Sequence, residues 1–191
     1  MRLILTRHGE TIENTQGVLQ GHLPGRLSEQ GKEQAKRLAV RLKDEKIDAM
    51  YSSDLARAVD TAQEIAKFHP RASLHLTQDL REVDLGSFTG KKKNEIDWNN
   101  RPADFETNEK IQQRAKHILE QVLHKHPNDT VVFVGHNKIN RALLSVILDK
   151  TAEEIHGIEQ PKNTSVYVFT ITEDKKHHIH LRNDISHLEG I

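Results

Sequence analysis

Short apolar runs between polar segments recur along the chain and predict the strands of a sheet. Three such runs, of strand length rather than helix length, occupy residues 3–5, 47–51 and 73–76. Residues 130–134 are apolar and rich in β-branched side chains, which predicts a central strand buried on both faces. Alternating apolar and polar residues at 165–172 and 178–181 predict a closing hairpin at a sheet edge.

Between these runs, apolar residues recur at the three- and four-residue spacing of amphipathic helices. In residues 28–44, Ala35, Leu38 and Leu42 fall on one face, and Ser28 is a suitable N-cap. The same spacing predicts helices over residues 55–68, 107–124 and 139–148, the last with Asn137 as its cap. Strands that alternate with helices in this way are typical of an α/β fold.

Two long segments lack a clear apolar period and are predicted to be loops that carry function. Residues 12–26 are rich in turn-forming residues, and the side-chain amides of Asn14 and Gln20 either bind a ligand or stabilise turns. The pattern leaves both roles open. Residues 88–108 are polar around Trp98, and we interpret them as an irregular excursion that forms a lid or a substrate wall.

The first apolar run leads directly into Arg7, His8 and Gly9. In open α/β sheets, ligands bind beyond the carboxyl ends of the strands. An arginine there suits phosphate or carboxylate, and a histidine can act as a nucleophile, a general base or a metal ligand. Alone, the pair would indicate an ordinary strand end with a surface arginine. Its meaning therefore depends on the other polar groups.

Three further candidates occupy comparable positions. His136 directly follows a predicted strand, beside a helix N-terminus that is expected to bind an anion. Arg57 lies in the first turn of a predicted helix, where a cation is unfavourable unless an anion is near. Glu82 lies in a loop, where a bound phosphate would favour the protonated form that a general acid requires. Separately, a surface arginine and a solvated glutamate are the simpler interpretations; with the Arg-His pair, the residues form a constellation.

Composition narrows the class of protein. The 191-residue chain balances 28 basic against 28 acidic side chains, so no overall basic charge indicates nucleic acid. The absence of cysteine excludes disulfides and thiol chemistry. No segment resembles a membrane span or a signal peptide, so we expect a cytoplasmic protein without a membrane partner. His177, His178 and His180 lack further ligands at a metal-site spacing and are interpreted as solvent-facing edge-strand residues.

Several separated motifs together resemble one family. The motifs are Thr6-Arg7-His8-Gly9-Glu10-Thr11, Asn14, Gln20-Gly21, Leu27-Ser28, Ser52-Ser53-Asp54-Leu55-Ala56-Arg57-Ala58, Leu80-Arg81-Glu82 and Gly135-His136. In this order, across nearly the whole chain, they resemble the phosphoglycerate mutase-like histidine phosphatase superfamily. The resemblance implies a three-layer α/β/α sandwich, with a mostly parallel sheet and an antiparallel edge strand, in a single domain over residues 1–191. It also implies a phosphohistidine mechanism without metal or cofactor.

The resemblance also implies roles for individual residues. By position, His8 resembles the family nucleophile, and Glu82 resembles the proton donor that later acts as the base for water. Three side chains, Arg7, Arg57 and His136, resemble the pocket that holds the phosphoryl group. Further matches to phosphate-binding positions are Asn14, Gln20, Gly21 and Asn137.

Two departures from the family pattern affect the pocket. The family often has glycine where Asn137 stands, so the larger side chain is expected to narrow the pocket. It also often shows Gly-Glu-Ser where Phe105-Glu106-Thr107 stands, which is expected to alter the lid and the choice of substrate.

Three functions are compatible with these residues. We favour a metal-independent phosphatase that acts on a small phosphorylated metabolite. A cofactor-dependent phosphoglycerate mutase is the alternative. The mutases of the family that the chain resembles are longer, with a larger insertion between these two positions, whereas only 54 positions separate Glu82 from His136 here. A non-catalytic module that binds phosphate esters is the third, but binding alone has no need for Glu82. The sequence leaves a homodimer open.

Overall fold

The computed structural model describes residues 1–174 and 176–190. Its centre is a six-stranded sheet with the order β3-β2-β4-β1-β5-β6. The strands are β1 (Arg2–Arg7), β2 (Ala49–Ser53), β3 (Ser73–Thr77), β4 (Thr130–Gly135), β5 (Val166–Thr170) and β6 (His178–Asp184). The first four pair in parallel, whereas β5 pairs antiparallel with both β1 and β6. The predicted parallel sheet with an antiparallel edge is confirmed.

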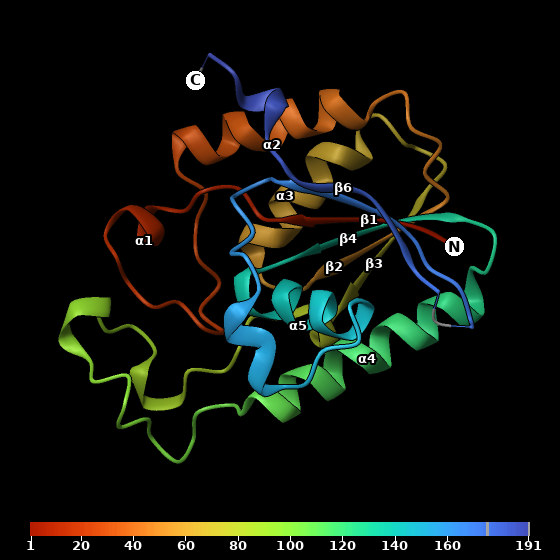
Figure 1. The fold of residues 1–191 in the computed structure, drawn as a ribbon. Coiled ribbons are helices and arrows are strands. Elements are labelled where there is room, and N and C mark those ends of the chain that lie inside the picture. The colour runs from red at the N-terminus through yellow and green to blue at the C-terminus, as the bar shows by residue number, and fades with distance from the viewer. Residues whose placement is uncertain (175, 191) are drawn as a thin grey trace.

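Helices cover both faces of this sheet (Figure 1). One face carries α2 (Glu29–Leu42) and α3 (Ala56–Ala66), and the other carries α4 (Asn108–Lys125) and α5 (Asn137–Ile147). Side chains of a strand alternate between faces. Accordingly, Leu3 and Leu5 of β1 pack in the apolar cluster with α4 and α5, while Ile4 packs in the cluster with α2 and α3. The expected three-layer α/β/α sandwich is confirmed.

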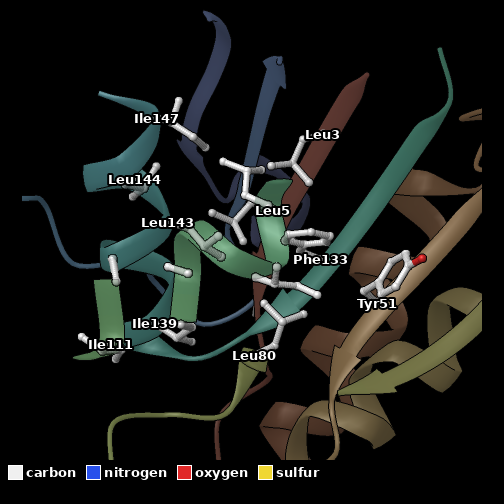
Figure 2. Packing of buried hydrophobic residues seen from close by; sticks show 14 of the residues in the cluster. Leu3, Leu5, Tyr51, Leu80, Ile111, Phe133, Ile139, Leu143, Leu144 and Ile147 are labelled. Atoms are coloured by element: carbon white, nitrogen blue, oxygen red, sulfur yellow. The ribbon is translucent and has the colours of Figure 1, made fainter. Parts of the chain in front are cut away.

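The larger apolar cluster lies between the sheet and the pair α4 and α5 (Figure 2). Leu5 of β1 and Phe133 of β4 are buried there with Leu143 of α5. Burying one such side chain contributes about 2 kcal/mol relative to leaving it exposed. The cluster holds α5 against β1 and β4, and this fixes the position of the helix N-terminus at the end of β4. The apolar residues of α4 recur at helical spacing, and the face that they form is buried throughout: Ile111, Ala115, Ile118, Leu119 and Val122.

The boundaries around β2 differ from the prediction. The strand begins at Ala49, two residues late, because Asp48 instead accepts a 2.9 Å hydrogen bond from the Thr130 amide. It continues through Ser52 and Ser53, which are buried despite their hydroxyl groups. Helix α3 has no side-chain cap, because its N-cap residue is Leu55. Ser53 Oγ instead accepts from the amide of Leu55 itself at 3.2 Å.

Two further predictions about helices need correction. The expected loop over residues 12–26 contains a short helix, α1 (Ile12–Thr15), stabilised by a reciprocal capping box between Thr11 and Asn14. Helix α5 begins at Asn137 with His136 as its N-cap, so Asn137 is not the cap. Short 3₁₀ segments complete the fold: η1 (Gln78–Leu80), η2 (Gly86–Phe88), η3 (Lys93–Glu95), η4 (Glu153–Gly157) and η5 (Ser186–Leu188).

The carboxyl ends of β1 and β4 meet at one edge of the sheet. The register pairs Arg7 with Gly135, and the His8 amide donates to the Gly135 carbonyl at 3.1 Å. The loop around α1 and the excursion before α4 both project from this edge (Figure 1). They are joined by backbone hydrogen bonds, including Gly90 to Leu19 at 2.7 Å. Within the described residues, no helix combines the length and apolar character needed to cross a membrane.

Candidate active site

Two histidines meet at the carboxyl edge of the sheet. Because β1 and β4 are neighbours in register, His8 and His136 leave adjacent strands at the same level. Their ring centroids lie 5.0 Å apart. His8 is 2% exposed and His136 is fully buried. The parallel pairing therefore places the two strand-end histidines side by side.

Hydrogen bonding sets the protonation of the His8 ring. Its Nδ1 lies 2.6 Å from the Gly9 carbonyl oxygen, which can only accept, so Nδ1 carries the proton. The lone pair is then on Nε2. Burial, together with the charges of Arg57 and Arg7, holds the pKa of His8 well below its usual range. A neutral imidazole with an available Nε2 lone pair has the protonation state of a nucleophile.

The backbone around His8 is held from three sides. The Asn163 side-chain amide donates to the His8 carbonyl at 2.9 Å, and the Gly9 amide donates to Thr61 Oγ1 at 3.1 Å. A Cβ on Gly9 would lie 2.5 Å from the Gly31 carbonyl oxygen at the start of α2. Only glycine permits this approach, so the glycine after the histidine serves close packing.

Arg57 is 1% exposed and links the second histidine to the loop that follows α1. Its Nε donates to His136 Nδ1 at 3.2 Å, and its Nη2 donates to the Gly21 carbonyl at 2.9 Å. Its Nη1 donates to the carbonyls of Leu23 and Pro24. Burial lowers the pKa of Arg57 to about 10, which leaves it a cation at neutral pH. Arg57, the cation predicted in the first turn of α3, therefore binds both the loop after α1 and His136.

His136 has the opposite tautomer to His8. Because its Nδ1 accepts from Arg57, the proton of the neutral ring is on Nε2. Burial and the Arg57 charge hold the pKa of His136 well below its usual range, so the ring remains neutral. Its Nε2 is buried and has no hydrogen-bond partner among the described residues. This N–H is therefore a buried donor without an acceptor in the described chain, and its role toward a ligand stays a prediction.

Arg7 contributes a second cation to the same place. Its Nη1 donates to the Pro161 carbonyl at 2.9 Å, while its Nε is buried without a partner in the described chain. Burial lowers the pKa of Arg7, and the nearby charge of Glu82 opposes that shift. Arg7 and Arg57 together present positive charge beside both histidines.

Glu82 occupies the anion site that the sequence assigned to a ligand. Its Oε1 accepts from the backbone amides of Lys138 at 2.9 Å and Ile139 at 3.4 Å, in the first turn of α5. It also accepts from the Val83 amide at 2.9 Å. The prediction that this helix N-terminus would take a substrate anion needs correction, since it holds the carboxylate of Glu82 instead.

Sequence reasoning missed the residue that secures the loop of Glu82. Arg114 of α4 donates to the carbonyls of Asp79 and Arg81 at 2.8 Å and of Glu82 at 3.3 Å. It also forms a two-pronged ion pair with Glu106, at 3.1 and 2.9 Å. The sequence did contain a clue to this contact. Glu106 lies in the segment that departs from the family pattern, and Arg114 is a residue of opposite charge eight positions later.

The two candidate amides are engaged with the loop itself. Asn14 Oδ1 accepts from the Thr11 amide at 3.2 Å, and Gln20 Nε2 donates to Thr11 Oγ1 at 2.9 Å. The turn-stabilising role that the sequence left open is therefore realised. Both residues and Gly21 also line the cleft, as does Asn137, whose buried Oδ1 has no partner in the described residues. Their roles toward a ligand stay predictions.

A cleft of about 460 Å³ opens above these groups. This volume suits a small molecule. Residues predicted to form a substrate wall do line it, including Trp98 and Phe105. Sequence analysis did not anticipate the cations Lys138 and Arg141 on α5, although they follow His136 at positions that share one helix face.

The histidines of the closing hairpin lie elsewhere. His178 and His180 are exposed on β6 at the sheet edge, as predicted, and His180 contacts the Thr170 hydroxyl at 2.8 Å. His177 accepts from the Thr172 amide at 3.2 Å. In residues 1–174 and 176–190, no group of three or more histidine or acidic side chains is arranged to hold a metal ion.

The chain is similar in sequence to proteins that are named as phosphatases or as phosphoglycerate mutase-like proteins. The chain is 34% identical to phosphoglycerate mutase-like protein 4 of Arabidopsis thaliana, over 98% of this chain and 86% of the relative. It is 32% identical to the metal-independent phosphoserine phosphatase of the same plant, over 99% of this chain and 84% of the relative.

Fold and family comparisons agree with these relatives. YhfR of Bacillus stearothermophilus superposes with a TM-score of 0.91 at 28% identity, covering 98% of this chain and 99% of that chain. The family model of the histidine phosphatase superfamily (branch 1) matches residues 3–184, which include both histidines, both arginines and Glu82. The chain therefore belongs to branch 1 of the histidine phosphatase superfamily.

Proposed function

We propose that the protein is a phosphatase that hydrolyses small phosphate monoesters through a phosphohistidine at His8, without a metal. The observation that carries the proposal is the state of the His8 ring. It is neutral, its Nδ1 proton is bound to Gly9, and its Nε2 lone pair adjoins the cleft. Arg7 and Arg57 line the same cleft, and the unpartnered Nε2 proton of His136 belongs to a ring whose centroid lies 5.0 Å from that of His8.

The first step transfers the phosphoryl group to the enzyme. His8 Nε2 attacks phosphorus, and the bond from phosphorus to the ester oxygen breaks. Glu82, in its protonated form, gives its proton to the departing oxygen, which leaves as an alcohol. Arg7, Arg57 and His136 donate hydrogen bonds to the three equatorial oxygens, where charge is spread during transfer.

The second step returns the enzyme to its starting state. A water molecule attacks the phosphorus of phosphohistidine while Glu82, now a carboxylate, takes its proton. The bond to Nε2 breaks, inorganic phosphate departs, and the cycle closes with Glu82 protonated and His8 neutral. Splitting one difficult displacement into two is the advantage of a covalent intermediate.

The names of the relatives support this class of reaction and leave a mutase as the alternative. One is a metal-independent phosphoserine phosphatase and another is phosphoglycerate mutase-like. A mutase would return the phosphoryl group to a second hydroxyl of the substrate rather than to water. The short connection from Glu82 to His136 favours the phosphatase.

The test is phosphate release from a panel of small esters in the presence of a chelator, together with interconversion of 2- and 3-phosphoglycerate. We expect chelator-resistant hydrolysis, little interconversion, and loss of turnover in His8→Ala. His117→Ala, an exposed histidine of α4 outside the cleft, serves as the matched control and should keep wild-type rates. Interconversion without hydrolysis would identify a mutase, and inactivity toward all esters would favour the binding module.

A further inference from the structure

The outer part of the cleft is strongly cationic although the whole chain has no net charge. Besides Arg7 and Arg57, four cations line it: Lys93, Arg101, Lys138 and Arg141. Among its described lining residues, Glu82 is the only acid, and its Oε1 is held by the amides of α5. The two inner arginines suffice for one phosphoryl group. The four outer cations are therefore not explained by the reaction itself.

Within the part of the chain that the structure describes, these outer cations have no carboxylate partner. None of the four forms a salt bridge within residues 1–174 and 176–190. Arg141 donates one hydrogen bond, to the His156 carbonyl, and its Nε is buried without a partner in the described chain. A half-buried cation without a counter-ion is unfavourable unless an anion joins it.

Three elements bring these groups together. Lys138 and Arg141 lie one turn apart on α5, and the backbone amide of Lys138 binds the carboxylate of Glu82. Arg101 comes from the excursion before α4, where its guanidinium lies 5.3 Å from the ring centre of Phe105. His156 comes from η4, and its Nε2 lies 3.1 Å from the Asn108 side-chain amide. An Nε2 that accepts from Asn108 leaves the Nδ1 proton available as a further donor.

The positive charges of this cluster lower the pKa values of two of its members. Burial and the charges of Arg141 and Arg101 lower the pKa of Lys138 to about 8. The charges of Lys138, Arg101 and Arg141 also contribute to a lowered pKa of His156. The side chains therefore interact electrostatically, and all of them line the same cleft.

We propose that Lys138, Arg141 and Arg101 form a subsite for a second anionic group of the substrate. The preferred substrates are then phosphate monoesters that also carry a carboxylate or a second phosphate a few bonds from the ester. The inference rests on the proposed phosphatase function and adds a substrate class to it. Lys138 links the subsite to the chemistry, because the same residue holds Glu82 through its amide and the second anion through its ammonium.

The experiment compares kcat/KM for matched pairs of esters. O-phosphoserine and phosphoethanolamine differ only by the carboxylate. Propane-1,3-diyl bisphosphate and 3-hydroxypropyl phosphate differ only by the second phosphate. We expect the anionic member of at least one pair to be preferred by about 10- to 100-fold, the effect of a charge-assisted hydrogen bond. Whichever pair shows the larger ratio identifies the anion as carboxylate or phosphate.

Lys138→Met removes the charge and keeps the length of the side chain. It should reduce the preference within the pair about tenfold or more, while its rate with 4-nitrophenyl phosphate shows that the variant folds and turns over. Lys138→Arg should retain much of the preference. Lys110→Met, an exposed lysine in the first turn of α4 outside the cleft, is the control and should leave every ratio unchanged.

The outcomes separate the two proposals. Hydrolysis of 4-nitrophenyl phosphate with equal rates for both members of each pair would overturn the subsite and leave the phosphatase intact. An unchanged preference in Lys138→Met would also overturn it. Inactivity of the wild-type protein toward every ester, including 4-nitrophenyl phosphate, would overturn the proposed function itself.

Discussion

The rings of His8 and His136 lie 5.0 Å apart and have opposite tautomers. His8 donates through Nδ1 to a carbonyl, which leaves a lone pair on Nε2. His136 accepts through Nδ1 from Arg57, which leaves a proton on Nε2. In the proposed mechanism, the Nε2 lone pair of His8 attacks phosphorus and the Nε2 proton of His136 is donated to a phosphoryl oxygen. Burial lowers the pKa of both rings, so neither ring gains a second proton at neutral pH and each keeps its tautomer.

The tautomer of His136 predicts an order among its variants. His136→Ala should lower kcat by about 10²- to 10³-fold, the usual loss for one donor to a developing charge. His136→Gln can place an N–H near the position of Nε2 and should recover part of that loss. Steady-state kinetics with one ester would measure both. Equal rates for the two variants would contradict a donor role for Nε2.

Glu82→Gln should slow esters with poor leaving groups more than esters with good ones. An alkyl ester needs a proton on its departing oxygen, whereas 4-nitrophenolate leaves readily without one. The measurement is kcat/KM for an alkyl phosphate and for 4-nitrophenyl phosphate, in variant and wild type. Equal losses on both esters would remove Glu82 from the role of acid.

Arg114 predicts a stability effect away from the reacting atoms. Its ion pair with Glu106 is largely buried, with side-chain exposures of 18% and 13%. Arg114→Ala would leave the carboxylate of Glu106 without its cation and the carbonyls of Asp79 and Arg81 without this donor, which should lower the free energy of unfolding by about 3 kcal/mol. Urea unfolding would measure it. Lys116→Ala removes an exposed ion pair with Glu120 of the same helix and should cost less than about 1 kcal/mol.

The buried histidines predict a fall in stability on acidification. The pKa values of His8 and His136 are lowered in the folded protein, chiefly by burial, so the unfolded chain binds more protons below about pH 6.5. The stabilisation is complete above that pH and is lost as the pH falls. Each histidine contributes a slope of up to about 1.4 kcal/mol per pH unit. Unfolding of His136→Gln should depend less steeply on pH than that of the wild type between pH 6.5 and 5, and identical slopes would contradict the prediction.

The strand ends were the most predictable part of the molecule. Arg7, His8 and His136 follow apolar runs, and a parallel sheet brings such ends to one edge, so their meeting follows from the pattern. The inward face of α4 was predictable for the same reason, since helical spacing alone defines it.

Long-range polar contacts were not predictable from the pattern. Nothing local indicates that the α5 N-terminus holds Glu82 rather than a ligand, because Glu82 and Lys138 are far apart in sequence. Similarly, the sequence shows Arg114 only as one of several polar residues of α4. Its contact with the Glu82 loop depends on the folded structure. Ser52 and Ser53 were not predicted to belong to β2, because serine has only a weak preference for strands. Their pairing with β4 and β3 outweighs that preference.

The most direct test of the central claim is to trap the phosphorylated enzyme during turnover. A rapidly quenched reaction, digested and analysed by mass spectrometry under alkaline conditions that preserve phosphohistidine, should show one phosphoryl group on His8. The same group should be absent from His8→Ala and present in the exposed-surface control His117→Ala. Turnover of His8→Ala at the wild-type rate, or a phosphoryl group on another residue, would contradict the account.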